Sequence, residues 1–134
     1  QVYMTRDRDI DMTLQQRLRL SYQYKPDVFL SIHANSIGPE VNIDNIYGFS
    51  AHYSDPIAKK MSTTLVTQVT QLLARKSRGA KKDNFYVVRG TWAPSVLIET
   101  GFMPNPLEYD WLSDAAMQKQ LAEVIANAFK EGLK

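Results

Sequence analysis

Two short apolar runs, each ending on a residue with a titratable side chain, are the clearest feature in the pattern of hydrophobic and polar positions. Residues 28–32 are followed by His33, and residues 95–98 are followed by Glu99. Short runs rich in β-branched and aromatic residues predict buried strands. Open α/β sheets bind their ligands at the carboxyl ends of the strands. If the two strands are parallel neighbours, His33 and Glu99 therefore emerge on the same rim of the sheet.

Three more segments have the pattern of strands. Residues 1–6 alternate apolar and polar side chains, and residues 46–53 and 85–88 are rich in aromatic and β-branched residues. Residues 35–45 contain Gly38, Pro39 and several polar residues, so they are predicted to form a loop beside the rim.

Four helices are predicted from capping residues followed by apolar side chains at helical spacing. Thr13 caps the first helix. Asp55 and Pro56 begin the second, which is expected to continue to about Lys76 and to stop at Gly79; Asn105 and Pro106 open a short third helix through Trp111; and Ser113 caps the last helix. Strands that alternate with helices predict a single α/β domain over residues 1–134, with a mostly parallel central sheet and helices on both faces, in three layers.

Composition narrows the possible functions. The 134 residues are 44% hydrophobic and 22% charged, as in an ordinary soluble domain. A formal charge of +2 is too small to indicate a nucleic-acid partner. Cysteine is absent, so a metal site would need His, Asp or Glu ligands. No apolar run approaches the roughly 18 residues of a membrane helix.

The strand-end residues have both a functional and a structural interpretation. His33 is either a metal ligand or a half-buried hydrogen-bonding residue. Glu99 follows three apolar residues, where a carboxylate is costly to bury without a partner, so it is either a functional group or one half of an ion pair with Arg89 or another cation. One imidazole and one carboxylate on a shared rim suggest a metal-assisted hydrolase.

The neighbouring polar residues are assigned lesser roles. Arg89 is expected at the end of the strand 85–88, where it either contacts an anionic substrate group or makes an exposed salt bridge. Ser31 and Asn35 are expected to orient the loop that follows His33. His52 is in phase with Ser50 on its strand and is expected to face solvent.

Four motifs, in this order and spacing, carry a resemblance that covers essentially the whole chain. They are Tyr3-Met-Thr-Arg-Asp7, Ser31-Ile-His-Ala-Asn35, Asp83-Asn-Phe-Tyr-Val-Val-Arg89 and Glu99-Thr-Gly-Phe-Met-Pro-Asn-Pro106. Together they resemble the zinc-dependent N-acetylmuramoyl-L-alanine amidases of bacterial cell walls, of the Amidase_3 type. The resemblance implies a mostly parallel sheet with a zinc ion at its carboxyl rim, held by two histidines and a glutamate.

The resemblance also implies an activity. Such enzymes hydrolyse the amide between the lactyl group of N-acetylmuramic acid and the L-alanine of the stem peptide. The second histidine ligand falls on His33 and the catalytic glutamate on Glu99, while Asn35 and Arg89 are expected to bind substrate. Zinc would lower the pKa of a bound water and polarise the carbonyl, and Glu99 would move the proton from that water to the leaving amine. The implied partners are peptidoglycan or muramyl peptides, and the implied location is extracellular, in the cell wall or periplasm of a bacterium, or with a phage lysin.

One departure from the family pattern changes the prediction. The first strand of the family, with a Gly-His-Gly type motif that carries the first histidine ligand, and the glutamate ligand after it have no counterpart in these residues. We therefore expect the N-terminal part of the fold to be missing, zinc (one ion per complete domain) to bind weakly or not at all, and the chain alone to be inactive. An exposed sheet edge with possible dimerisation is a further expectation. Residues 35–45 are too short for the long helix that blocks the groove in many relatives.

Two other functions are considered. The chain could be a non-catalytic, wall-binding or structural module that has lost its metal site, in which case no upstream His and Glu would exist in the parent protein. It could also be a zinc hydrolase of peptides, like the carboxypeptidases. The motif that begins at Glu99 favours the amidases.

Overall fold

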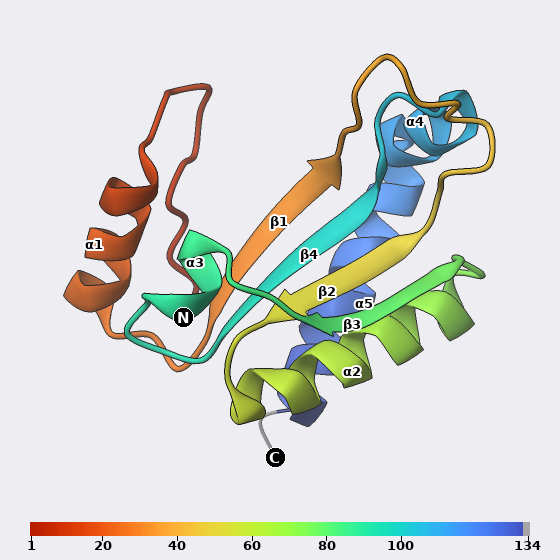
Figure 1. Cartoon of the computed structure of the whole chain (residues 1–134). Coiled ribbons are helices and arrows are strands. Elements are labelled where there is room, and N and C mark those ends of the chain that lie inside the picture. The colour runs from red at the N-terminus through yellow and green to blue at the C-terminus, as the bar shows by residue number, and fades with distance from the viewer. Residues whose placement is uncertain (133–134) are drawn as a thin grey trace.

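The computed structural model describes residues 1–132, and its elements are shown in Figure 1. In chain order they are α1 (Leu14–Tyr24), β1 (Phe29–Asn35), β2 (Phe49–Tyr53), α2 (Pro56–Leu72), β3 (Ser77–Lys82), α3 (Tyr86–Arg89), β4 (Ser95–Phe102), α4 (Pro106–Ser113) and α5 (Ala115–Gly132). Strands and helices are interspersed along the chain, so the predicted α/β class is confirmed.

The four strands of the described part of the chain form one sheet in the order β1-β4-β2-β3. The pairs β1–β4 and β2–β3 are parallel, whereas β2 and β4 run antiparallel. The sheet is therefore mostly parallel, as predicted. The two predicted site strands, β1 and β4, are direct parallel neighbours, with β1 at one edge.

One face of the sheet carries the main core under α2 and α5, which pack against each other. Its largest fully buried side chains are Phe49, Met61, Leu65, Val69, Val96 and Ile98. Alternate residues of β2 and β4 point into this core because side chains along a strand alternate between faces. The apolar residues that recur along α2 are buried only in the middle of the helix, since Ile57 and Leu72 near its ends are 62% and 67% exposed.

The opposite face is covered only at one end. A small apolar cluster of Phe29, Leu97, Val87 and Val88 seats α3 on β1 and β4, and α1 lies against α3 (Figure 1). The Ser21 hydroxyl of α1 accepts a hydrogen bond from the Trp92 backbone N–H at 3.1 Å. Helices thus lie on both faces, as predicted, but beyond Leu97 this face carries polar side chains.

Most of the predicted helix starts are confirmed. Thr13 and Gln16 form a reciprocal capping box at α1, Asp55 caps α2 before Pro56, and Asn105 caps α4. The start of α5 differs by one residue. The Asp114 carboxylate, not Ser113, accepts hydrogen bonds from the N–H groups of Ala116 and Met117.

Two predicted strands are wrong. Residues 1–6 are not in a strand, and Val2 and Met4 are 84% and 71% exposed. An alternating pattern forms a strand only where a neighbouring strand accepts its hydrogen bonds. Phe85 precedes the short helix α3, and residues 86–88 lie within it. Val87 and Val88 are buried against a face of the sheet and do not form one of its strands.

The region between α2 and α3 was also predicted incorrectly. Helix α2 ends at Leu72, and Ala74 adopts a positive φ of 50°. Residues 77–82, Ser-Arg-Gly-Ala-Lys-Lys, then form β3, an edge strand with no apolar run. Gly79, expected to stop the helix, lies inside this strand with φ 85°. Strand β2 begins at Phe49, three residues later than predicted.

Candidate functional site

His33 and Glu99 are brought side by side by the parallel pairing of β1 and β4. They are direct register partners, in a run that begins with Phe29 opposite Ser95. Register partners in a sheet present their side chains on the same face. The predicted juxtaposition of this imidazole and this carboxylate is therefore what the strand register produces, on the face opposite the main core.

The surroundings of both groups favour their uncharged forms. Burial raises the pKa of the Glu99 carboxyl above its ordinary value. Burial also lowers the pKa of the His33 imidazole, and the positive charges of Arg17 and Arg6 lower it further. A neutral imidazole is the form that binds metals, and a carboxylate with a raised pKa is suited to general acid–base chemistry.

Glu99 has no cation to neutralise it among residues 1–132. Its Oε2 atom is buried and accepts no hydrogen bond there, and neither of the two ion pairs in this part of the chain includes Glu99 or Arg89. The structural alternative, an ion pair with Arg89, is thus not formed. A buried polar atom without a partner is rare in folded proteins and points to a functional role.

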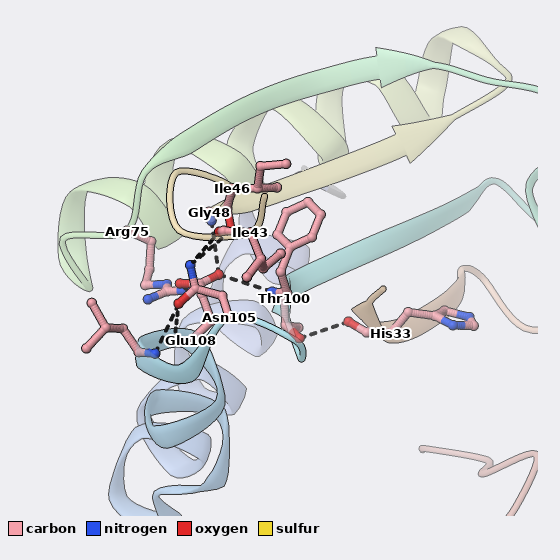
Figure 2. A network of polar contacts seen from close by, with 10 residues as sticks. His33, Ile43, Ile46, Gly48, Arg75, Thr100, Asn105 and Glu108 are labelled. Carbon is pink, nitrogen blue, oxygen red and sulfur yellow. Dashed lines mark hydrogen bonds and ion pairs between the residues drawn. The ribbon is translucent and has the colours of Figure 1, made fainter. Parts of the chain in front are cut away.

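A bulge fixes the chain just beyond the two side chains. His33 pairs with Glu99, but Asn35 pairs with Phe102, so β4 has one residue more than β1 over this interval. The Thr100 hydroxyl donates to the His33 carbonyl at 2.8 Å (Figure 2), and the Asn35 carbonyl accepts from Met103 N–H at 2.9 Å. Bulges near active sites re-aim side chains. Here the two hydrogen bonds to the carbonyls of His33 and Asn35 hold the bulge in place.

A second buried carboxylate, Glu108, organises the loop that follows β4 (Figure 2). Its Oε2 atom accepts from the backbone N–H of Gly48 at 3.0 Å and of Phe102 at 3.2 Å, and its Oε1 atom pairs with Arg75. The Arg75 guanidinium lies over the Trp111 ring, 4.2 Å from its centroid. Glu108, Arg75, Gly48 and Phe102 thus form a hub that links β2, β4, α4 and the segment after α2.

Asn105 extends the hub to the loop between β1 and β2. Its amide oxygen caps α4, and its Nδ2 atom donates to the carbonyls of Ile43 and Ile46 at 3.1 and 3.2 Å. Residues 36–48 contain turns and no helix, in agreement with the predicted loop. The sequence indicated Asn105 as a helix cap, but no pattern indicated its long-range contacts or the pairing of Glu108 with Arg75.

Next to Glu99 on the same face lies a chain of polar side chains that sequence reasoning missed. His52 is only 8% exposed, so its predicted solvent-facing position is wrong. Its Nε2 atom lies 3.1 Å from the Ser50 hydroxyl and its Nδ1 atom 3.1 Å from an Asp83 carboxylate oxygen. Burial lowers the pKa of His52, against the opposing effect of Asp83. The one available signal was the i, i+2 spacing of Ser50 and His52.

The predicted substrate-binding residues lie at different places. Asn35 ends β1, two residues beyond His33. Arg89 is exposed at the end of α3 and lies over the Tyr86 ring, 5.8 Å from its centroid. Because α3 is a helix, the expectation that Arg89 ends a strand at the same rim is wrong.

The described residues do not form a complete zinc site. One imidazole and one carboxylate are donors of suitable chemistry, and the Glu99 Oε2 atom has no hydrogen-bond partner within residues 1–132. However, residues 1–132 contain no group of three or more His, Asp or Glu side chains placed to hold a metal ion, and catalytic zinc needs about three protein ligands.

Within the same residues, no helix is both long and apolar enough to cross a membrane.

Comparison with known proteins points in one direction. A family model described as N-acetylmuramoyl-L-alanine amidase matches residues 1–131. The probable cell wall amidase LytH of Staphylococcus saprophyticus is 30% identical over 134 residues, which are 99% of this chain and 41% of that protein. The chain spans 59%, 41% and 25% of the lengths of three curated relatives that it matches.

Two solved structures share the fold. The catalytic domain of CwlV, an N-acetylmuramoyl-L-alanine amidase from Bacillus (Paenibacillus) polymyxa var. colistinus, is 32% identical with a TM-score of 0.89. An N-acetylmuramoyl-L-alanine amidase from Clostridium difficile 630 is 29% identical with a TM-score of 0.92. Each comparison covers 99% of this chain and 72% of the other.

Proposed function

The chain belongs to the N-acetylmuramoyl-L-alanine amidase family, and from this premise we propose that it is the catalytic part of a peptidoglycan hydrolase. The bond cleaved is the amide between the lactyl group of N-acetylmuramic acid and the L-alanine of the stem peptide. The substrate is peptidoglycan or a muramyl peptide.

The observation that carries the proposal is the pairing of His33 with an unpartnered Glu99 on one face of the sheet. Glu99 acts as the general base: it takes a proton from the attacking water and returns it to the leaving amine. A pKa raised by burial brings the carboxyl nearer to neutrality, where such a group transfers protons most effectively in both directions.

The neighbouring residues receive positioning and binding roles in this proposal. His33, kept neutral by burial and by Arg17 and Arg6, is one ligand of the zinc ion. Asn35, at the end of β1, binds substrate close to the reacting bond. Arg89, exposed at the end of α3, binds an anionic group of the stem peptide farther away.

The incomplete ligand set leads to a second part of the proposal. Because residues 1–132 supply one imidazole and one carboxylate at the site, this chain alone binds zinc weakly and is inactive. The complete domain holds one zinc ion, with further ligands from parts of the parent protein other than these residues. Within residues 1–132, the edge strand β1 pairs with β4 alone, and dimerisation of the isolated chain through its other edge is part of the same proposal.

The proposed location is extracellular, in the cell wall or periplasm, where the substrate lies. The naming of one relative as a probable cell wall amidase supports this location. Residues 1–134 belong to a single catalytic domain in this proposal, and the parent is either a bacterial enzyme or a phage lysin.

The incomplete ligand set also favours a second candidate, a peptidoglycan-binding or structural module without catalysis. The two candidates differ in what the zinc-loaded parent protein does to purified muramyl peptides. The amidase releases stem peptides with a free L-alanine amino group, and its Glu99→Gln variant releases none. The module binds peptidoglycan and leaves the amide intact. Simple peptides test the carboxypeptidase alternative, because an amidase leaves them uncleaved.

Zinc content tests the ligand argument directly. Elemental analysis of the purified 134-residue chain after dialysis is expected to give far less than one zinc per chain. A value near one would overturn the proposed inactivity, because it would mean that another side chain, or a second copy of the chain, completes the site.

A further inference from the structure

The sheet face that carries His33 and Glu99, opposite the main core, also contains a buried row of hydrogen-bonded side chains that the proposed reaction does not use. Ser50, His52 and Asp83 are linked by two contacts of 3.1 Å, from the Ser50 hydroxyl to His52 Nε2 and from His52 Nδ1 to the Asp83 carboxylate. Ser50 and His52 are 2% and 8% exposed, so both lie inside the protein. The Asp83 end opens to solvent at a hollow of about 510 Å³ lined by Ser54, Lys82, Asp83 and Asn84.

The inner end of this row lies opposite the strand position of Glu99. Ser50 and Glu99 are direct register partners in the antiparallel pair of β2 and β4. Such partners have Cβ atoms about 4.5–5.5 Å apart on one face of the sheet. The Glu99 Oε2 atom has no hydrogen bond within residues 1–132. Ser50 is the β2 residue opposite Glu99, so its hydroxyl is the β2 side-chain group placed to contact this carboxylate.

The direction of each hydrogen bond follows from chemistry. A carboxylate only accepts, so the His52 nitrogen that faces Asp83 carries a proton, and the opposite nitrogen of neutral His52 must accept. Ser50 then donates its only proton to His52 and can offer Glu99 nothing but lone pairs. When His52 is protonated, both ring nitrogens donate, and the Ser50 proton becomes free to point at Glu99.

We propose that Ser50, His52 and Asp83 form a relay in which the protonation state of His52 decides whether Glu99 receives a hydrogen bond from Ser50. With neutral His52, the Glu99 carboxylate receives no donor from β2 and keeps its basicity. With protonated His52, Ser50 donates to the carboxylate and makes it a weaker base. The relay residues are positioning residues for Glu99, and this role rests on the proposed function.

The groups around His52 fit this role. Asp83 and Lys81 are the charged groups that face it from the β3 side, with opposite effects on its protonation. From the start of α3, the Phe85 ring meets His52 edge-on at 5.2 Å and adds no charge. The same three residue types also occur as the nucleophilic triad of serine hydrolases, but the Ser50 hydroxyl is buried and is not presented to a substrate.

The first test needs neither zinc nor substrate. Long-range ¹H–¹⁵N spectra of the labelled chain report the tautomer of each histidine, and His33→Gln assigns the two rings. Neutral His52 is expected as the Nδ1–H tautomer. The Nε2–H tautomer would overturn the relay, and this measurement requires no variant at the relay itself.

The second test asks whether Glu99 and His52 communicate through Ser50. Glu99→Gln is expected to shift the titration midpoint of His52 in the otherwise unchanged chain, and to leave it unshifted when combined with Ser50→Ala. Ser62→Ala is the matched control, because Ser62 is a fully buried serine on α2, and it should leave the shift intact. A shift that persists without the Ser50 hydroxyl, or no shift in either background, would show that the three residues only brace β2 against the chain after β3.

The third measurement separates the relay from the amidase proposal. In the zinc-loaded parent protein, kcat is expected to fall at low pH as His52 becomes protonated. Ser50→Ala is expected to remove this fall while changing KM little. Ser50→Thr, which keeps the hydroxyl, is expected to restore it. Absence of any amide hydrolysis by the parent would reject the amidase proposal and leave the spectroscopic result standing. If an active Ser50→Ala enzyme showed the same fall of kcat at low pH, the relay would be rejected and the amidase proposal would be unaffected.

Discussion

Two glutamates near the ends of the motif from β4 to α4 meet opposite fates. Glu108 is 3% exposed, and its two oxygens pair with Arg75 and with the backbone N–H groups of Gly48 and Phe102. Glu99 is partly buried nine residues earlier, and its inner oxygen has no partner within residues 1–132. A satisfied buried carboxylate holds structure together, whereas an unsatisfied one is a strained group available for a reaction.

The backbone explains why the two differ. Glu99 lies within β4, where the backbone N–H groups are already used in the ladder and only neighbouring side chains could pair with it. Glu108 lies in the first turn of α4 and points back at a bend of the chain, where backbone N–H groups are free of ladder partners. The comparison predicts that the Glu108 region determines stability and the Glu99 region determines activity.

The largest expected effect is at Glu108. Glu108→Gln removes the charge that compensates the buried Arg75 guanidinium, so unfolding should become easier by about 3–5 kcal/mol. Urea denaturation measures this loss, and Glu123→Gln, an exposed glutamate on α5, is the matched control. A loss no larger than that of the control would mean that Glu108 is not the structural carboxylate of the pair.

A methyl group at Gly101 should damage the same hub more mildly. A Cβ atom there would lie 2.7 Å from Glu108 Oε2 and 3.2 Å from an Arg75 nitrogen, so one of the two must move. We expect Gly101→Ala to destabilise the fold by about 1–3 kcal/mol. Gly38→Ala, where a Cβ would meet nothing within 4 Å, should change thermal unfolding little. Equal effects at the two glycines would contradict the hub.

Glu99→Gln should change the pH dependence of stability more than stability itself. The pKa of Glu99 is raised in the folded state, so between the unfolded and folded values the folded chain binds more protons. Stability therefore falls as pH rises through this window, above the ordinary glutamate value. The variant should lose this decline and equal or slightly exceed the parent near neutrality, by about 1 kcal/mol at most.

Urea denaturation at a series of pH values from about 4 to 8 compares the two chains across that window. Parallel stability curves for Glu99→Gln and the parent would show that Glu99 is not an uncompensated carboxylate. A lower stability of the variant near neutrality would show that it has a partner after all.

The smallest effect concerns the positive charges on the Glu99 side of the comparison. Arg17 helps to lower the pKa of His33, so Arg17→Gln should raise that pKa, and metal-free NMR titration measures the change. Arg19→Gln on the same helix is the control and should leave His33 unchanged, since Arg19 does not contribute to its pKa. A downward movement of the His33 pKa in Arg17→Gln would contradict the assigned direction.

Local signals in the sequence were sufficient for part of the structure. The apolar runs of β1 and β4 and the caps at Thr13, Asp55 and Asn105 were predicted correctly, because burial and capping act on residues close in sequence. The juxtaposition of His33 and Glu99 followed from one further rule, the shared rim of parallel neighbours. The order of four motifs identified the family.

Tertiary structure alone decided the rest. Strand β3 has almost no apolar residues and forms by pairing with β2, whereas residues 1–6 have a strand pattern but pair with no strand of the described sheet. The apolar residues Val87 and Val88 lie in a helix whose buried side chains pack on Phe29 and Leu97 of the sheet face. The partner of buried His52 is Asp83, which lies 31 residues later in the chain. Such pairings depend on register and on distant segments, which a periodicity of two or 3.6 residues does not encode.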